Sequence, residues 1–382
     1  MTATRPTWAE ISRRNLLHNY QWLGERAGSQ TELLAVVKAN AYGHGLEGCA
    51  QALVDAGASW LGVTCTEEGV ALRQFCPEAR ILIMTGLWQG EADAAVEHRL
   101  TPVVWEPQHL SWLKSAAQMR NMGAGQYPVH LEIDTGMSRQ GVQPAQLDRL
   151  LEQFAGESPL RLEAVMTHFH SPDNPEATEE QEQELARAAE AVVRCGLRPD
   201  YLSAGSSGAG LRQEASFVTE LAMRMGAKRM QRPGIALYGY APSAESQTQL
   251  LPVLSWKTRV VSLREIEPGD SVGYDATFTA RRKTRLGLLP VGYADGLNRL
   301  LSNQGWVLVR GQRAPIVGRI SMDHAVADVT GIAGVEKGDE VILIGEQGNE
   351  KVTAADMARL CGTIAYEVLC GIGARVPRIW VD

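Results

Sequence analysis

The sequence has 382 residues, a net charge of −7 and 45% apolar side chains, a composition that is typical of a soluble globular protein and argues against nucleic acid or an anionic membrane as a partner. Its length predicts one large and one smaller domain, because a single hydrophobic core rarely serves so long a chain. No apolar run is long enough to span a membrane, the N-terminus lacks the apolar core of a signal peptide, and six scattered cysteines without a CxxC pair favour reduced thiols in a cytoplasm.

Eight apolar, strand-like runs recur between residues 30 and 240, and most intervals between them carry helical spacing. We expect strands at residues 33–37, 60–65, 80–85, 101–105, 128–134, 162–168, 201–203 and 230–238. Helices are expected at 45–56, 67–75, 107–119 and 178–194, among others. Repeated alternation of this kind favours an α/β TIM barrel. An open doubly wound sheet is the alternative, because strand order cannot be read from sequence.

The pattern changes at a connector rich in Gly, Pro and Ser, residues 239–249. Beyond it, short alternating runs separated by turns predict a mainly antiparallel β domain, with a short helix at 354–361 and a last strand near 376–381. We therefore place the barrel at residues 10–241 and the β domain at 242–382, joined by residues 1–9. The opening segment 7–11 is short and can pair with this second domain.

The first expected barrel strand runs directly into a lysine. Residues 33–37 are all apolar, as expected of a strand buried on both faces, and Lys38 lies where the strand ends. Burial at the edge of the interior disfavours the ammonium form, so this lysine should lose its proton more readily than a surface lysine. A neutral, positioned amine is what a Schiff base to an aldehyde cofactor requires. The alternative is a lysine whose head group simply extends into solvent.

Polar residues follow the other expected strands, and active sites of TIM barrels lie at these carboxyl ends. An amine, an imidazole, a cation and a Ser/Gly-rich loop at 203–210, whose backbone N–H groups can cradle a phosphate, are the parts of a pyridoxal-phosphate site. The residues concerned are Lys38, Tyr42, Arg139, His168, His170, Arg232, Pro233, Gly234 and Ile235.

Two other chemistries are disfavoured. A metal at His168 and His170 lacks an acidic or cysteine partner at ligand spacing, so we expect no metal. A serine nucleophile would need a GxSxG elbow, which the sequence does not contain.

The chain resembles the alanine racemases, which are fold-type III pyridoxal-phosphate enzymes, along nearly its whole length. The resemblance rests on the motifs AVVKANAYGHG, EIDTGMSRQGV, MTHF, RPGIALYG, VGYDATF, LPVGYADG, GRISMD and AYEVLCGIGARVPR. It implies a barrel followed by a β domain. It also implies a head-to-tail homodimer in which each β domain closes the barrel mouth of the partner.

The resemblance further implies roles for individual residues. Lys38 carries the cofactor and is the base on one face of the substrate, and Tyr274 from the other subunit is the base on the opposite face. Arg232 contacts the pyridine nitrogen, and His168 lies beside the cofactor. The phosphate is served by Tyr42, Ser206, Gly234, Ile235 and Tyr366, and the substrate by Arg139, the backbone of Met322 and, at the entrance, Tyr293.

Two bases on opposite faces suit racemisation, which removes a proton from one face of Cα and returns one to the other. The resemblance thus implies a cytoplasmic enzyme that interconverts L-alanine and D-alanine and supplies D-alanine for peptidoglycan. A serine or broad-specificity racemase is the alternative on the same scaffold. A decarboxylase of basic amino acids has a different substrate loop, and a non-catalytic pyridoxal-phosphate-binding barrel lacks the β domain that carries Tyr274.

Several positions depart from the family pattern. Glu132 stands where relatives often have a lysine modified to a carbamate, Ser138 and Gln140 alter DTGMGRLG, and Ser321 replaces a cysteine. The phosphate loop reads Gly205-Ser206-Ser207, so the contact could come from either serine. We expect Glu132 to supply a permanent negative charge that pairs with Arg139. The alternative is a solvated glutamate at the strand edge.

Overall fold

The structure, a computed structural model, describes residues 5–172, 174–206, 216–241 and 249–382. The described chain divides into two compact units. The barrel unit contains the described residues of 16–41 and 46–251, and the β unit contains those of 5–15, 42–45 and 252–382. The expected boundary at 241/242 borders residues 242–248, which lie outside the described residues. Among the helices of the described ranges, none has the length and hydropathy that a membrane crossing needs.

Eight parallel strands close into a ring in the barrel unit. The ring closes because the first strand pairs with the second on one side and with the last on the other, where Thr31 lies opposite Arg229. This closure confirms the TIM barrel and excludes the open sheet. The strands are β2 Thr31–Val36, β3 Trp60–Val63, β4 Arg80–Ile83, β5 Leu100–Val104, β6 Tyr127–Glu132, β7 Leu160–Met166, β8 Tyr201–Gly205 and β9 Lys228–Gln231.

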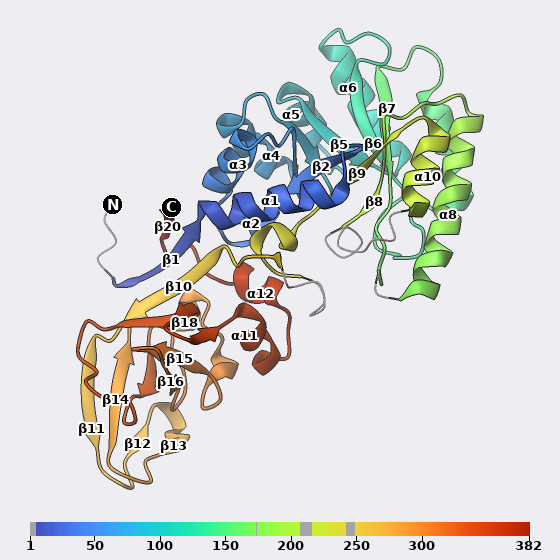
Figure 1. Cartoon of the computed structure of the whole chain (residues 1–382). Coiled ribbons are helices and arrows are strands. Elements are labelled where there is room, and N and C mark those ends of the chain that lie inside the picture. The colour runs from blue at the N-terminus through green and yellow to red at the C-terminus, as the bar shows by residue number, and fades with distance from the viewer. Residues whose placement is uncertain (1–4, 173, 207–215, 242–248) are drawn as a thin grey trace. The chain divides into compact units, whose positions relative to one another are not determined.

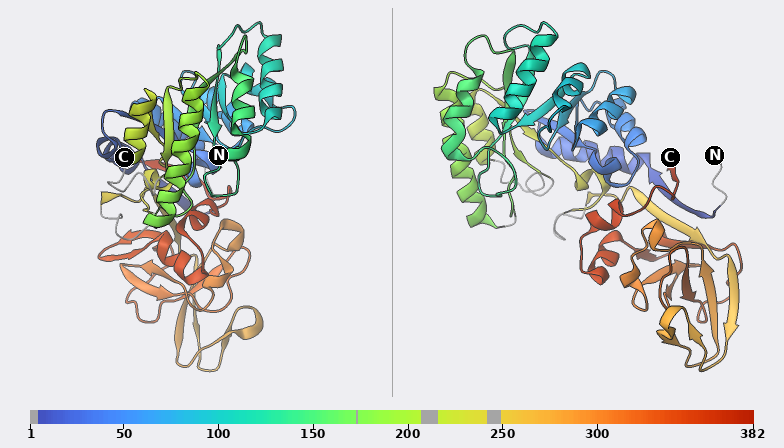
Figure 2. Two further views of the ribbon diagram at one scale, coloured as in Figure 1. Left: turned by 90° about the vertical axis from the view of Figure 1, so that its right-hand side faces the viewer. Right: turned by 180° about the vertical axis from the view of Figure 1, so that it is seen from behind.

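Helices cover the outer side of the strands, as all three views of Figures 1 and 2 show. The longest, α8 Pro175–Arg194, begins where the Asn174 side chain accepts a hydrogen bond from the Ala177 N–H (3.3 Å) and Pro175 fills the first turn. Its buried stripe, which includes Leu185 and Val192, follows the helical period and faces the barrel. The others are α1 Arg13–Ala27, α3 Leu46–Asp55, α4 Thr66–Phe75, α5 Glu91–Glu97, α6 Pro107–Met119, α7 Leu147–Leu151 and α10 Ser216–Met225.

The β unit is mainly antiparallel, as predicted. Its large sheet has the strand order β16-β15-β18-β10-β1-β20, with β19 beside β18, and β1 Thr7–Ser12 runs antiparallel to β10 and parallel to β20. The opening segment thus pairs with this unit. The sheet strands are β10 Leu254–Arg259, β15 Trp306–Val309, β16 Gln312–Pro315, β18 Glu340–Gln347, β19 Glu350–Val352 and β20 Arg378–Val381. A second sheet contains β11 Ser262–Ile266, β14 Thr284–Leu289 and β17 Ala325–Asp328, and a short hairpin contains β12 Ser271–Val272 and β13 Phe278–Thr279.

One local expectation was wrong, and one helix was missed. The expected strand at 230–238 stops at Gln231, and residues Ile235–Tyr238 form the 3-10 helix η3. Pro233 explains the break, because it has no N–H to continue a ladder. The expected short helix is α11 Ala354–Cys361, but a further helix, α12 Ala365–Cys370, follows it and carries Tyr366.

Candidate active site

Lys38 lies half-buried at the carboxyl end of β2, where it begins a left-handed turn. Ala39, Asn40, Ala41 and Tyr42 have φ angles of 53°, 55°, 54° and 52°. None of these four residues is glycine, and each L-residue in this conformation costs about 1–2 kcal/mol. Strain of this kind persists only where the surroundings over-determine the backbone, and it is concentrated at functional sites.

Arg232, just beyond β9, is a buried cation with fixed geometry. One terminal nitrogen donates to the carbonyl oxygen of Ser203 (3.0 Å) and to its hydroxyl, and the other donates to the carbonyl oxygen of Thr167 (2.7 Å). Burial lowers the pKa of the guanidinium to about 10, so Arg232 remains charged at neutral pH.

His168 follows β7 and is neutral at physiological pH. Burial, and then the positive charges of Arg232, Arg139 and Lys38, lower the pKa of its imidazole to about 3. Lys38, Arg139, His168 and Arg232 follow the carboxyl ends of β2, β6, β7 and β9, and parallel strands bring these ends to one side of the barrel. The effect of the three cations on the pKa of His168 agrees with this grouping.

Gln181 on α8 holds the backbone that follows this histidine, on either side of Phe169. Its amide oxygen accepts from the His170 N–H (3.0 Å), and its amide nitrogen donates to the His168 carbonyl oxygen (3.2 Å) and to the Thr135 hydroxyl (3.0 Å). The side chain is buried, so these bonds are sheltered from water. The β7–α8 loop is therefore tied both to α8 and to the loop after β6.

Glu132 at the end of β6 does not form the expected ion pair with Arg139. The described residues give it Gln140 as its partner, whose amide nitrogen donates to the carboxylate at 2.6 Å and also to the Met84 carbonyl oxygen at 2.9 Å. Arg139 is exposed. Glu132 is only 2% exposed, so the solvated alternative is wrong as well. Burial raises the pKa of Glu132, while the Gln140 hydrogen bond and the charges of Arg232 and Arg139 oppose that rise.

The residues expected to hold a phosphate in the barrel unit lie after β8 and β9. Ser206 is half-buried immediately beyond β8, and Ser207 lies outside the described residues. Gly234 and Ile235 follow Arg232, with Gly234 at the amino end of η3. The choice between Ser206 and Ser207 therefore stays a prediction.

Tyr42 and Tyr366 come together within the β unit. Their ring centroids are 6.1 Å apart. Burial raises the pKa of both phenols, to about 12 for Tyr366, so both remain neutral hydroxyl donors. Gly43 is required beside them, because a Cβ there would lie 2.3 Å from the Leu369 carbonyl oxygen.

Tyr274 and Met322 are exposed in the β unit, at 70% and 53% of their side-chain surface. Tyr274 begins the 3-10 turn η5 Tyr274–Ala276 between β12 and β13, where the Asp275 carboxylate lies 2.8 Å from Arg319.

The loop that carries Met322 is held by a buried carboxylate that sequence analysis did not single out. Asp295, which is fully buried, accepts from the Gly292 N–H (3.0 Å) and from Arg375 (2.8 Å), and Arg375 also donates to Asp323 (2.6 Å). Gly292 cannot be replaced, since a Cβ would lie 2.3 Å from the Ser321 carbonyl oxygen. The only sequence signal for this network is the occurrence of Asp295, Asp323 and Arg375 within three of the motifs.

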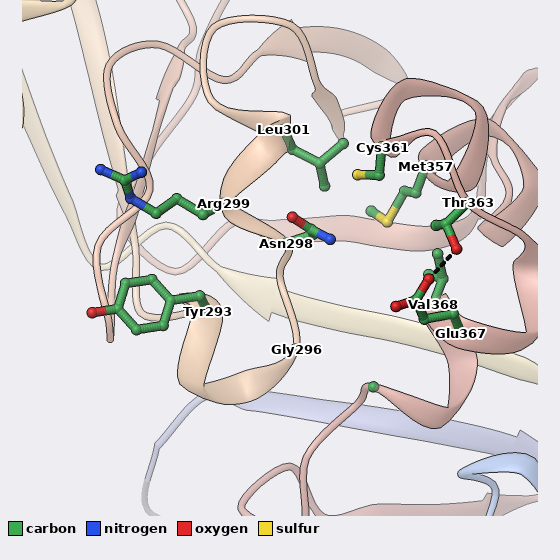
Figure 3. A pocket seen from close by; sticks show the side chains of 11 residues that line it. Tyr293, Gly296, Asn298, Arg299, Leu301, Met357, Cys361, Thr363, Glu367 and Val368 are labelled. Atoms are coloured by element: carbon green, nitrogen blue, oxygen red, sulfur yellow. Dashed lines mark hydrogen bonds between the residues drawn. The ribbon is translucent and has the colours of Figure 1, made fainter.

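Tyr293 lines a cavity of about 290 Å³ in the β unit. Figure 3 shows this cavity between the loop that carries Tyr293 and Arg299 and the helical segment that carries Met357 and Cys361, with a hydrogen bond from Thr363 to Glu367 at one side. No other predicted site residue lines it. Within the described residues, no group of three or more His, Cys, Asp or Glu side chains is placed to hold a metal.

Comparison with known proteins gives one result for both units. Residues 11–242 match the N-terminal domain of alanine racemases, and residues 253–380 match the C-terminal domain. The alanine racemase of Halothermothrix orenii is 40% identical over 98% of this chain and 97% of its own. The alanine racemase structure from Streptomyces coelicolor has a TM-score of 0.90 at 35% identity, covering 100% of this chain and 99% of that one. The Bartonella henselae alanine racemase, solved with covalently bound pyridoxal phosphate, has a TM-score of 0.86 at 29% identity, covering 98% and 99%. The chain therefore belongs to the alanine racemase family of enzymes.

Proposed function

We propose that this chain is a pyridoxal-phosphate-dependent alanine racemase that interconverts L-alanine and D-alanine. The observation that carries the proposal is the grouping of Lys38, Arg232 and a neutral His168 at the carboxyl end of the barrel. The full-length similarity to alanine racemases, and the cofactor in the Bartonella henselae structure, support it.

The residues at the barrel end fit this cofactor. The Lys38 amine is the group that can link to its aldehyde, and a flat, uncharged imidazole at His168 can lie against its ring. Arg232 is a fixed cation whose terminal nitrogens are oriented by backbone carbonyls, so it favours an unprotonated pyridine nitrogen. Pyridoxal phosphate, when bound, supplies the electron sink for the negative charge that develops at Cα. The proposed phosphate contacts are Tyr42, Ser206, Gly234, Ile235 and Tyr366.

Racemisation needs proton transfer on both faces of Cα, and this chain offers two groups for it. We assign the Lys38 amine to one face and Tyr274 of the partner subunit to the other. A homodimer with shared sites is supported by the high exposure of Tyr274 on its hairpin, because a partner would bury it. Arg139, which is exposed and cationic, is assigned to the substrate, together with the Met322 backbone and Tyr293 at the entrance.

The proposed substrate is alanine rather than serine. Ser138 and Ser321 lie in motifs near the substrate, which is why a serine racemase is the alternative. The Ser321 hydroxyl is engaged in its own turn, because it donates to the His324 carbonyl oxygen (3.0 Å) and accepts from the His324 N–H (3.1 Å). This favours alanine over serine. All six cysteines are free thiols, which supports the proposed cytoplasmic location. The further proposal that the enzyme supplies D-alanine for peptidoglycan rests on the resemblance to alanine racemases alone.

A chiral assay of the purified protein with pyridoxal phosphate tests the proposal. L-alanine should give D-alanine and the reverse, with serine a poorer substrate and no carbon dioxide released from lysine or ornithine. Borohydride should trap the cofactor on Lys38, as read by peptide mass spectrometry, and Lys38→Ala should lose both the trapped cofactor and the activity. Decarboxylation without formation of an enantiomer, or a trapped cofactor retained in Lys38→Ala, would contradict it.

A further inference from the structure

The strained turn after Lys38 is bound by one carboxylate from a different element. Glu68, in the first turn of α4 and half-buried, uses both of its oxygens. Oε1 accepts from the Ala39 N–H at 2.7 Å, and Oε2 accepts from the Thr64 N–H at 2.9 Å. Ala39 is the residue immediately after Lys38, and Thr64 is the residue immediately after β3.

The Glu68 carboxylate supplies a hydrogen-bond acceptor just beyond the point where the backbone hydrogen bonds between β2 and β3 end. The pairing of β2 with β3 finishes with the bond from the Val37 N–H to the Gly62 carbonyl oxygen (2.8 Å). The next amide in that series belongs to Ala39, and it turns instead to Glu68 because the backbone has become left-handed. The Thr64 carbonyl oxygen is taken by the Thr85 hydroxyl at 2.6 Å. Glu68 thus joins the ends of two neighbouring strands on either side of the lysine's exit point.

Other hydrogen bonds hold later residues of the turn. Asn40 accepts from the Leu46 N–H at 2.8 Å, and the Ala41 N–H donates to the Val37 carbonyl oxygen at 2.8 Å. Ala39 itself is exposed, so its side chain does not hold the conformation by packing. The Glu68 hydrogen bond therefore acts on the backbone amide of the first left-handed residue, directly next to Lys38.

We propose that Glu68 is a positioning residue for Lys38, holding the strained turn so that the amine stays aligned for the cofactor. The inference rests on the proposed function of Lys38. A carboxylate suits the role because it offers two acceptors and no donor, whereas a carboxamide offers one acceptor. A glutamate at this position that served only to cap α4 would bond the backbone N–H of the N-cap residue Cys65, whereas Glu68 bonds the N–H groups of Thr64 and Ala39.

Four variants separate positioning from charge and from helix stability. Glu68→Gln keeps the size and loses one acceptor, and Glu68→Asp keeps the charge but is too short to reach both amides. Glu47→Gln is the matched control, an exposed glutamate in the first turn of α3. Lys38→Ala identifies the trapped cofactor. The wild type and the Glu68 and Glu47 variants are measured for kcat, for KM, for the pyridoxal-phosphate concentration that half-saturates borohydride trapping at Lys38, and for hydrogen exchange of the peptide 33–45.

Both Glu68 variants should lower kcat by about 10- to 100-fold, because small misplacement of a reacting group has effects of this size. KM should change far less, trapping should need more cofactor, and the peptide 33–45 should exchange faster, while Glu47→Gln matches the wild type. Wild-type kcat, trapping and exchange in Glu68→Gln and Glu68→Asp would overturn the inference. If Glu68→Asp behaves as wild type and only Glu68→Gln fails, charge and not positioning is responsible, and the inference is also overturned.

A glycine substitution supplies a rescue. Glycine adopts the left-handed conformation without the Cβ penalty, so Ala39→Gly added to Glu68→Gln should recover about fivefold in kcat. Asn121→Gly, at an exposed left-handed residue after α6, should recover nothing. Equal recovery by both glycines would mean a global stability effect and would overturn the inference. Trapping of the wild-type cofactor on another lysine would overturn the proposed function, and this inference with it. Trapping on Lys38 with unaffected Glu68 variants would overturn this inference alone.

Discussion

Glu163 provides a quantitative test of the barrel interior. Its carboxylate on β7 is fully buried and accepts from Arg80 at 2.6 Å through both oxygens, from Arg161 at 2.6 Å, and from His130 at 3.4 Å. Burial alone would raise its pKa, but the hydrogen bonds from His130 and Arg80 outweigh burial and lower the pKa to about 2.

The shift from 4.5 to about 2 corresponds to about 3 kcal/mol of stability at neutral pH. Removing one partner of a buried charge pair costs about 3–5 kcal/mol, which is consistent. We therefore expect Glu163→Gln to lower the Tm of the barrel transition by about 6–12 °C at pH 7.

The pH dependence follows from the sign of the shift. Because the folded pKa is depressed, the stabilisation is fully present above pH 4.5 and is lost as the pH falls through the folded value near 2. The gap in Tm between wild type and Glu163→Gln should therefore narrow from pH 5 toward pH 3. Circular dichroism melts of the two proteins measure it, with the exposed Glu157→Gln as control. A gap of less than 2 °C at pH 7, or a gap that widens in acid, would refute the reasoning.

Two further predictions concern the loops that carry the site. Gln181→Ala removes three hydrogen bonds and leaves the His168 carbonyl and the His170 N–H without this partner. It should lower the free energy of unfolding by about 2–4 kcal/mol and lower kcat more than it raises KM. Gln183→Ala, at an exposed glutamine of the same helix, is the control and should change neither. If kinetics are unchanged, Gln181 does not position His168. Gln140→Leu should lower the free energy of unfolding by about 1.5–3 kcal/mol, because the buried Glu132 carboxylate loses its 2.6 Å donor. Chemical denaturation measures the change, and an unfolding free energy equal to that of the wild type would show that this hydrogen bond does not stabilise the loop after β6.

Sequence analysis found the elements whose pattern is local. Runs such as 33–37 are continuously apolar because strands of a covered parallel sheet are buried on both faces, and this made the barrel predictable. The strand-end residues Lys38, His168 and Arg232 were found because parallel strands bring their carboxyl ends together. The strand at 230–238 was drawn too long because its apolar residues continue past Pro233, which ends the ladder.

Sequence analysis did not find the contacts between residues that are far apart in the sequence. Ala39 is left-handed although it is not a glycine, so the sequence does not indicate this conformation. The Glu68 carboxylate that bonds its N–H lies 29 residues away in the sequence. Glu163 lies in the strand LRLEAVM, where its partners Arg80 and His130 are 83 and 33 residues away in the sequence, so its burial among them was not recognised. The expected pairing of Glu132 with Arg139 failed because the Gln140 side chain donates to this carboxylate, while Arg139 is exposed.

The central claim is a racemase site built from Lys38 of one subunit and Tyr274 of the partner subunit. It is tested most directly by mixing two inactive proteins, Lys38→Ala and Tyr274→Phe, under conditions where subunit exchange is confirmed by mass spectrometry. Each mixed dimer then contains one site with both groups intact and one with neither. The account predicts recovery of alanine racemisation in proportion to the mixed dimer, up to about half of the wild-type activity per dimer. Complete exchange with no recovered activity would contradict it.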